Sequence, residues 1–405
     1  MTLLNLQKAI YLSIRDISQK NSVNLKLEEC LNRILSENLI SKKNSPPHDV
    51  SAMDGYAINI KSLDDTSSSL KVVGVIAAGK KYTKTVKIGE AVRIFTGSEM
   101  PKGANTVVIQ ENVKKKDNTI IVENIPRKFQ NIRKKGFDFR INSILLKKGT
   151  RLTPKHIALS AAMNYRKLPV IERPSVAIIS TGSELVEPGS LQAKNNIICS
   201  SNYGIKTYIE SLGGVATDFG IVPDEINSIK KKIMSLNKFD VIVTIGGASV
   251  GDYDLVKKSI EKDLNLKFWK IAMRPGKPLI FGYVKNSCLL GLPGNPVSAL
   301  VCCQLFLKPM INKFLNLTQN KVHYHEARLE IDLNENDERE DYLRASYKNG
   351  FVTPNKNQDS SSLSTLAQSN AFIVRKPVDR AKNKGELVKI VKVDLSFQDL
   401  LTLFL

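Results

Sequence analysis

The pattern of apolar and polar positions divides the chain into segments of different character. Apolar residues at helical spacing predict two helices in residues 1–45, which a Ser-Pro-Pro sequence terminates. Residues 46–140 carry short β-branched runs separated by turn residues, which indicates a small β-rich domain. Residues 141–171 return to a short strand and a helix that begins at a Thr-Pro pair. We therefore expect 1–45 and 141–171 to form one discontinuous helical domain.

Strands and helices alternate in residues 172–315, the pattern of a parallel sheet with crossover helices. Residues 241–245, VIVTI, do not alternate with polar residues, which favours a strand buried on both faces. Residues 316–405 form a last β-rich unit. The predicted fold class is α/β plus β, multidomain: a three-layer αβα domain with a parallel-type sheet, the discontinuous helical domain and two smaller β-rich domains.

Four loops after predicted strands, following residues 180, 245, 273 and 292, are rich in glycine or carboxylates. Ligands of open parallel sheets bind beyond the carboxyl ends of the strands, so this topology brings the four loops to one edge. The loop after 245 reads GGASVGDYD. Its glycines let backbone N–H groups approach an anion, and its carboxylates suit a divalent cation. A glycine turn before a helix capped by Asp252 or Asp254 explains this sequence equally well.

The candidate strand ends offer side chains that suit Mg²⁺-dependent chemistry on a phosphate or an anhydride. They are the carboxylates Glu184, Asp224, Asp252 and Asp254 and the cations Lys270, Arg274 and Lys277. The chain contains no Walker A sequence, G-x-S-x-G elbow or kinase motif set, which disfavours the common phosphoryl and acyl machineries. Local rules alone interpret the polar stretches around Asp54 and Thr96 as turns.

The formal net charge of +21 is compatible with nucleic acid, an anionic ligand or a lysine-rich surface. The lysines are scattered and no aromatic residues are interleaved, so a solvated surface is favoured and no nucleic-acid partner is expected. No apolar run reaches the ~20 residues that span a bilayer. The N-terminal segment has no small-residue cleavage site. We expect a cytoplasmic protein without a membrane partner, whose five cysteines are reduced core thiols.

Several sequence motifs, taken together, resemble one known family. They are PPHDVSAMDGYA, RIFTG, STGSEL, TIGGASVGDYD, WKIAMRPGKP and LPGNPVSAL, in this order. The chain resembles the molybdopterin molybdenumtransferases, bacterial homologues of the gephyrin E domain, over essentially its whole length. The resemblance implies an elongated homodimer, with an active cleft between the α/β domain of one subunit and the small β domain of the other. It implies insertion of molybdate into adenylylated molybdopterin, with Mg²⁺ and release of AMP.

Carried over by motif, the resemblance implies roles for individual residues. The implied catalytic residues are Asp54, Asp138, Glu184 and Asp254. The implied metal ligands are Glu184, Asp224 and Asp254. The implied substrate-binding residues are Thr96, Asp224, Gly246, Gly247, Ser249, Lys270, Arg274 and Lys277. Arg274 stands where some relatives have lysine, and arginine binds oxyanions in a fork rather than as a point charge. Phe137 stands where many relatives have a carboxylate. A serine-rich loop at 360–364 resembles that of the family.

Two other functions stay open on the sequence. The first is a molybdopterin adenylyltransferase, which activates molybdopterin with ATP on a similar α/β domain; the additional β domains and the SAMDGYA motif argue against it as the sole role. The second is a non-catalytic scaffolding protein, and the retained acidic residues argue against it. The partners implied by the resemblance are adenylylated molybdopterin, molybdate, a second copy of the chain, molybdopterin adenylyltransferase and apo-molybdoenzymes.

Overall fold

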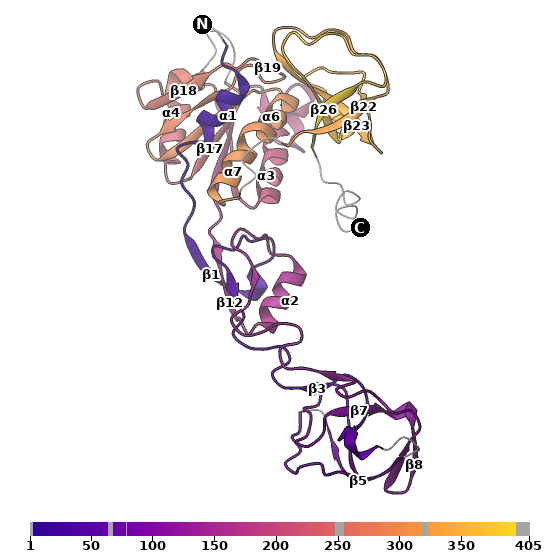
Figure 1. The fold of residues 1–405 in the computed structure, drawn as a ribbon. Coiled ribbons are helices and arrows are strands. Elements are labelled where there is room, and N and C mark those ends of the chain that lie inside the picture. The colour runs from indigo at the N-terminus through magenta and orange to yellow at the C-terminus, as the bar shows by residue number, and fades with distance from the viewer. Residues whose placement is uncertain (1–2, 64–67, 78, 248–254, 318–322, 394–405) are drawn as a thin grey trace. The chain divides into compact units, whose positions relative to one another are not determined.

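The computed structural model describes residues 3–63, 68–77, 79–247, 255–317 and 323–393. They belong to two compact units, one of Met1–Ser22 with Ile171–Leu405 and one of Val23–Val170. Figure 1 shows the helices and strands of both units. Within the described ranges, every helix is too short or too polar to cross a membrane.

The larger unit is built on a mixed sheet. Its strands are β13 (Ser175–Thr181), β16 (Val215–Val222), β17 (Val241–Ile245), β18 (Leu264–Trp269), β20 (Ile280–Val284) and β21 (Ser287–Leu292). They lie in the order β16-β13-β17-β21-β20-β18. The neighbours from β16 to β21 are parallel, whereas β20 runs antiparallel to β21 and β18. All residues of β17 are buried, which confirms the predicted strand with two covered faces.

Helices cover both faces of this sheet, as the predicted three-layer arrangement requires (Figure 1). They are α1 (Leu6–Ile14), α3 (Ser201–Leu212), α4 (Ile226–Ser235), α5 (Leu255–Ser259), α6 (Pro296–Cys302) and α7 (Lys308–Phe314). On one face α3 contacts α6 and α7, and α1 packs on α7. On the other face, Ile229 and Ile233 of α4 and Val256 of α5 form a core with Ala177 and Ile242 of the strands.

The apolar helical segment after Asn295 contains a π-helical turn, Cys303–Leu307, between α6 and α7. Pro309 explains it, because proline has no N–H and its ring clashes with the carbonyl of the residue four positions earlier. A wider turn just before the proline relieves that clash. Cys302 and Cys303 are fully buried there. Burial raises the pKa of the Cys303 thiol well above its usual value, as expected of a core thiol.

The C-terminal residues form a second sheet in this unit, as predicted. Its strands are β22 (His325–Leu329), β23 (Glu340–Lys348), β24 (Phe351–Pro354), β25 (Ala371–Arg375) and β26 (Leu387–Lys392), joined by β19 (Met273–Arg274) from the α/β part. The order is β19-β23-β24-β22-β26-β25, and β23 also pairs with β25, which closes the sheet on itself. The short helix α8 (Leu363–Ala367) follows the serine-rich loop.

The smaller unit contains the predicted β-rich domain. Its main strands are β4 (Gly55–Ile58), β5 (Ser68–Ile76), β6 (Glu90–Ile94), β7 (Thr106–Ile109), β8 (Val113–Lys116) and β9 (Thr119–Val122). They lie in the order β7-β4-β6-β5-β9-β8. Two apolar clusters fill it, one around Tyr56 and Leu70 and one around Ile76 and Val92.

The helical prediction for residues 1–45 is wrong in two respects. First, α1 packs on α7 and belongs to the larger unit. Second, residues 22–40 form β1 (Ser22–Lys26), a 3-10 turn at Leu27–Glu29 and β2 (Leu39–Ile40) instead of a helix. Tertiary pairing overrides the helical spacing there: β1 pairs with β12 (Lys167–Ile171) and β2 with β11 (Ile144–Leu146).

Residues 22–40 and 139–170 nevertheless share one core. Leu35 and Leu39 pack with Phe139, Leu152 and Val170. The later segment contains the predicted helix, α2 (Pro154–Ala162), with Thr153 as its N-cap. Residues 22–40 and 139–170 therefore pack together as predicted for the discontinuous domain, but only the second segment contains an α-helix.

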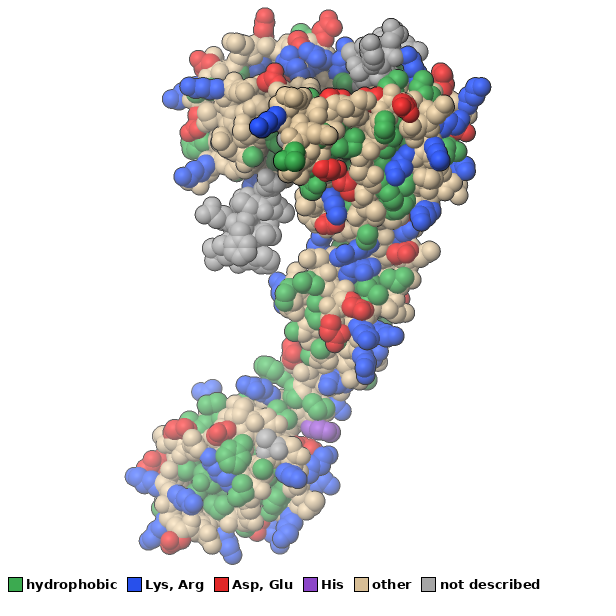
Figure 2. Space-filling model, turned by 180° about the vertical axis from the view of Figure 1, so that it is seen from behind, with side chains coloured by type: hydrophobic (Ala, Val, Ile, Leu, Met, Phe, Trp, Pro, Cys, Tyr) green, Lys and Arg blue, Asp and Glu red, His purple; other side chains and the backbone are tan. Residues whose placement is uncertain are grey.

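Basic side chains are spread over the surface drawn in Figure 2, with acidic side chains among them. This distribution differs from the continuous basic stripe that is typical of nucleic-acid-binding domains. On that face, the basic side chains are therefore distributed over the surface and do not form one patch.

Candidate functional site

A cavity of about 620 Å³ lies beyond the carboxyl ends of β13, β17 and β21. Residues from the loops after these strands and after β16 line it, and Pro278 adds a residue from the segment that follows β19. The cavity therefore lies at the carboxyl edge of the sheet, where the topology predicts ligand binding. The lining residues that matter below are Thr181, Glu184, Asp224, Gly246, Gly247, Asn295 and Ser361.

Two predicted metal-binding carboxylates, Glu184 and Asp224, line this cavity. A reciprocal contact joins their loops: the Ser183 N–H donates to Asp224 Oδ2 at 3.3 Å, and the Asp224 N–H donates to Ser183 Oγ at 3.4 Å. Among the described residues no group of three potential metal ligands is found. Asp254 and Asp252, like Ser249, lie outside the described residues.

The glycines after β17 bring the backbone close to Thr181. Gly246 and Gly247 have φ angles of +88° and +62°, which favour glycine. A Cβ on Gly246 would lie 2.5 Å from the Thr181 carbonyl oxygen, and one on Gly247 would lie 2.7 Å from Val256 Cγ2. The Thr181 hydroxyl is buried without a hydrogen-bond partner among the described residues. Two glycines and one buried hydroxyl therefore form one wall of the cavity.

The serine-rich loop reaches the same cavity from the C-terminal sheet. Asn295 Nδ2 donates to Ser360 Oγ at 2.9 Å, and Ser361 lines the cavity. Asn295 stands at the N-cap position of α6, but its side chain makes no capping hydrogen bond and contacts the loop instead. The structure thus singles out Ser360 and Ser361. No sequence signal distinguishes these two, because each serine in the loop is locally equivalent.

A buried cation lies behind this loop. Arg344 is only 2% exposed, its Nη2 donates to the Asp359 carbonyl oxygen at 3.4 Å, and its Nε has no partner in the described chain. Burial lowers the pKa of the guanidinium from its usual value. Sequence reasoning missed Arg344, since an arginine within a strand pattern resembles a surface residue.

The basic residues predicted to bind substrate, Lys270, Arg274 and Lys277, are absent from the described residues that line the cavity. Lys270 Nζ lies 3.9 Å from the centroid of the Trp269 ring. Arg274 forms ion pairs with Asp337 and Asp341. Lys277 is half-buried, and its carbonyl oxygen accepts from the Ile271 N–H. Lys270 and Arg274 are therefore close in sequence but contact different side chains of the protein.

In the smaller unit, Asp54 and Thr96 are in direct contact. Antiparallel pairing of Gly55 with Ile94 sets the loops that carry them side by side. The backbone N–H and the hydroxyl of Thr96 both donate to Asp54 Oδ1 at 2.8 Å. These bonds lower the pKa of Asp54 below its usual value because they favour the charged carboxylate. The two residues that the sequence assigned from separate motifs therefore form one pair.

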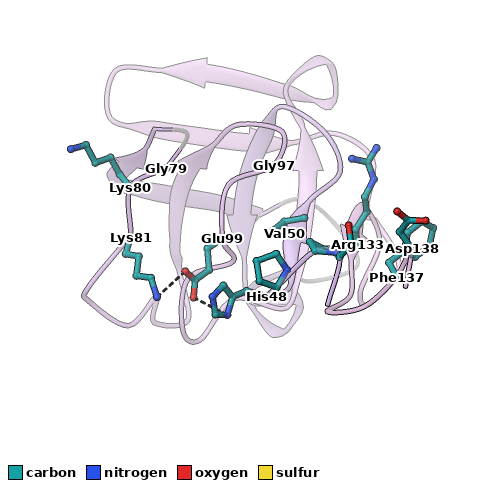
Figure 3. Close-up of a pocket in the computed structure, with 13 residues that line it drawn as sticks. His48, Val50, Gly79, Lys80, Lys81, Gly97, Glu99, Arg133, Phe137 and Asp138 are labelled. Carbon is teal, nitrogen blue, oxygen red and sulfur yellow. Dashed lines mark ion pairs between the residues drawn. The ribbon is translucent and has the colours of Figure 1, made fainter. Parts of the chain in front are cut away.

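Asp138 lines a second cavity of about 670 Å³, which lies wholly in this unit (Figure 3). Gly97, the neighbour of Thr96, lines it as well. Figure 3 shows His48, Lys81 and Glu99 converging on one another: Glu99 lies 3.9 Å from His48 Nδ1 and 3.3 Å from Lys81 Nζ. Arg133 and Asp138 lie on the other side. Arg133 was not singled out from the sequence because it belongs to a run of basic residues.

The chain matches three family models in succession. Residues 3–164 match the MoeA N-terminal region (domain I and II), residues 177–313 a probable molybdopterin binding domain, and residues 326–393 the MoeA C-terminal region (domain IV). The second match covers most of the α/β part and the third covers the C-terminal sheet, whereas the first contains α1 of the larger unit together with most of the smaller unit.

Relatives and solved structures match over most of the chain. A molybdopterin molybdenumtransferase of Haemophilus influenzae is 36% identical over 374 residues, 90% of this chain and 92% of the relative. That of Bacillus subtilis is 33% identical over 91% of this chain and 89% of the relative. The crystal structure of a molybdopterin biosynthesis MoeA protein from Pyrococcus horikosii matches 97% of this chain and 100% of its own, with a TM-score of 0.86 and 28% identity. The chain therefore belongs to the molybdopterin molybdenumtransferase family.

Proposed function

We propose that this chain inserts molybdate into adenylylated molybdopterin, with Mg²⁺ and with release of AMP. The observation that carries the proposal is the cavity at the carboxyl edge of the sheet, where Glu184 and Asp224 meet a glycine wall and a serine loop. The family membership supplies the reaction, and this cavity supplies the oxygen ligands and the backbone donors that such a reaction needs.

The donor set fits a hard divalent cation. Glu184 and Asp224 offer carboxylate oxygens, which are the ligands that Mg²⁺ prefers. They leave room for water and phosphate oxygens, as Mg²⁺ sites usually do. Asp254 is the further ligand predicted from the sequence. When bound, Mg²⁺ supplies charge neutralisation on the phosphate oxygens as a phosphoanhydride is cleaved.

The chain's own groups bind and orient the anionic substrates. The backbone at Gly246 and Gly247 can approach a phosphate closely because neither residue carries a Cβ. The Thr181 hydroxyl is buried without a partner among the described residues, and we propose that it donates to a phosphate oxygen of the bound substrate. The Arg344 guanidinium stabilises negative charge near the serine loop, since a buried cation is screened little by water.

We further propose that Asp54, Thr96 and Asp138 complete this site across a homodimer. Asp54 is held ionised by Thr96, and Asp138 lines a cavity of mixed charge. Both are carboxylates on loops, which is where catalytic groups concentrate. In this arrangement the α/β cavity of one subunit receives these residues from the other, as the family resemblance implies.

The deciding experiment measures AMP release from adenylylated molybdopterin with Mg²⁺, in the presence and absence of molybdate. We expect molybdate-dependent release by the wild type and a loss of at least about 100-fold in Glu184→Gln, as for removal of a transition-state contact. Glu187→Gln is the matched control, because Glu187 lies near Glu184 in sequence but is absent from the described lining. No AMP release from folded wild-type protein would disprove the proposal.

A further inference from the structure

Arg274 lies where the α/β part meets the C-terminal sheet. It ends β19, which pairs in parallel with β23 through Met273 with Glu340 and Arg274 with Asp341. The Glu340 N–H also donates to the Ala272 carbonyl oxygen at 3.0 Å. A short segment of the α/β part is therefore hydrogen-bonded to the edge of the C-terminal sheet.

Most N–H groups of the Arg274 guanidinium donate hydrogen bonds to side-chain oxygens of the protein. Nε donates to Asp341 Oδ1 at 2.7 Å, and Nη2 donates to the other oxygen of the same carboxylate. Nη1 donates to Asp337 Oδ2 at 2.9 Å, and Nη2 also donates to Asn336 Oδ1 at 3.3 Å. These contacts leave about one of the five N–H groups of a guanidinium for any other partner. Arg274 therefore has little capacity to bind substrate.

Asp341 depends on this arginine. Its side chain is 3% exposed, whereas that of Arg274 is 46% exposed. A buried carboxylate without a partner is costly, because it loses its water shell. The two parallel bonds from Arg274 meet that need in the planar geometry that lysine cannot reproduce. The pair thus fixes the first residues of β23 against β19.

The strand that carries Asp341 is hydrogen-bonded to the segment that carries the serine loop. Three residues further along β23, the Arg344 N–H donates to Gln358 Oε1 at 2.9 Å, and Gln358 Nε2 donates back to the Arg344 carbonyl oxygen at 2.9 Å. Asp359 Oδ1 then accepts from the Ser361 N–H at 2.8 Å. Ser361 lines the cavity. A fixed β23 therefore places the loop.

We propose that Arg274 is a positioning residue: its fork on Asp341 anchors β23 and thereby holds Ser360 and Ser361 at the cavity. This differs from the direct substrate contact expected from the sequence. The consequence for catalysis depends on the proposed function, but the placement of the loop does not. The two can therefore be tested separately.

Hydrogen exchange of the full-length protein tests the placement. In Arg274→Lys and Asp341→Asn, we expect the amides of residues 357–362 to exchange at least about tenfold faster than in the wild type, since a buried charge pair is broken. Arg339→Lys is the matched control. Arg339 forms its ion pair with Asp337 rather than with Asp341, so the amides of residues 357–362 should exchange as fast as in the wild type. Unchanged exchange in the folded Arg274 and Asp341 variants would overturn the proposal, whether or not the enzyme turns over.

Kinetics separate positioning from direct binding. If Arg274 contacts molybdate or phosphate, Asp341→Asn frees its guanidinium and should preserve or lower KM. Positioning instead predicts that both single variants lose kcat/KM to a similar extent. It also predicts that the double variant is no worse than the poorer single variant, because both changes remove one interaction. Additive losses, or a lower KM in Asp341→Asn, would overturn it.

Discussion

The Asn295 side chain donates to the Ser360 hydroxyl at 2.9 Å, which ties the loop before α6 to the serine loop of the C-terminal sheet. We predict that Asn295→Ala lowers kcat/KM for AMP release by about tenfold. This fold-change corresponds to the net free energy of roughly one hydrogen bond that positions the loop. The melting temperature should change little, because Asn295 makes no capping hydrogen bond to α6.

Ser360→Ala should produce the same loss, and the double variant no more than either single variant, since all three remove the same bond. Steady-state kinetics beside thermal unfolding checks this. A melting temperature that falls in step with activity would mean that Asn295 acts through stability instead.

Gly246→Ala should lower the free energy of unfolding by more than backbone strain alone, which usually costs about 1–3 kcal/mol. The added Cβ would lie 2.5 Å from the Thr181 carbonyl oxygen as well as adopting a positive φ. Gly220→Ala is the control, because Gly220 has a φ of +76° and, apart from its chain neighbours, no described residue has an atom within 4 Å of the new Cβ. Urea unfolding of the two variants should therefore separate the clash from the strain, and equal losses would contradict the close approach to Thr181.

Thr96→Val should raise the pKa of Asp54. The wild-type carboxylate accepts from the Thr96 N–H and hydroxyl, and valine removes the hydroxyl bond alone. Since the folded-state pKa lies below the unfolded one, the stabilising effect is present above pH ~4 and is lost as pH falls through the folded pKa. A carboxyl NMR titration measures the shift. Thr119→Val, which changes a hydroxyl bonded to the Lys116 carbonyl, should leave the Asp54 titration unchanged.

Mixing two inactive variants tests the cross-subunit site. Asp54→Ala and Glu184→Ala should each be inactive alone. If the site combines these residues from different subunits, random exchange makes half of the dimers mixed, each with one intact site, so about a quarter of wild-type activity should return. AMP release after subunit exchange measures it. If both residues act from the same chain, no activity returns.

The cysteines should be unreactive in the folded protein. All are buried, and burial raises the pKa of Cys288 to about 12. At pH 8 the thiolate fraction is therefore small, and access is blocked as well. We expect no labelling by a thiol reagent in the native state and labelling of five thiols after unfolding in denaturant. Fast native labelling of any cysteine would contradict the buried thiol assignment.

The sequence predicted well those features that depend on local periodicity and topology. Buried β17 follows from five β-branched residues, and the meeting of Glu184, Asp224 and Gly246 follows from the parallel order of their strands. Features that depend on long-range partners were not predictable. The segment around Leu39 has helical spacing, but its pairing with residues near Ile144 determines a strand.

Individual side chains show the same limit. Asn295 has the sequence context of an N-cap, and only the folded position of Ser360 reveals its other partner. Arg274 stands in a cationic motif, and its carboxylate partners lie more than sixty residues away, at separations of 63 and 67 residues. No local rule can assign partners at that distance, because they depend on how two sheets meet.

Trp269 is the single tryptophan of the chain, and the ammonium groups of Lys257 and Lys270 each lie 3.9 Å from the centroid of its ring. Tryptophan emission therefore reports the state of the α/β part alone. Unfolding of residues 23–170 would be invisible to this fluorophore, although circular dichroism would detect it. A difference between the two optical transitions would give the order in which the two units unfold.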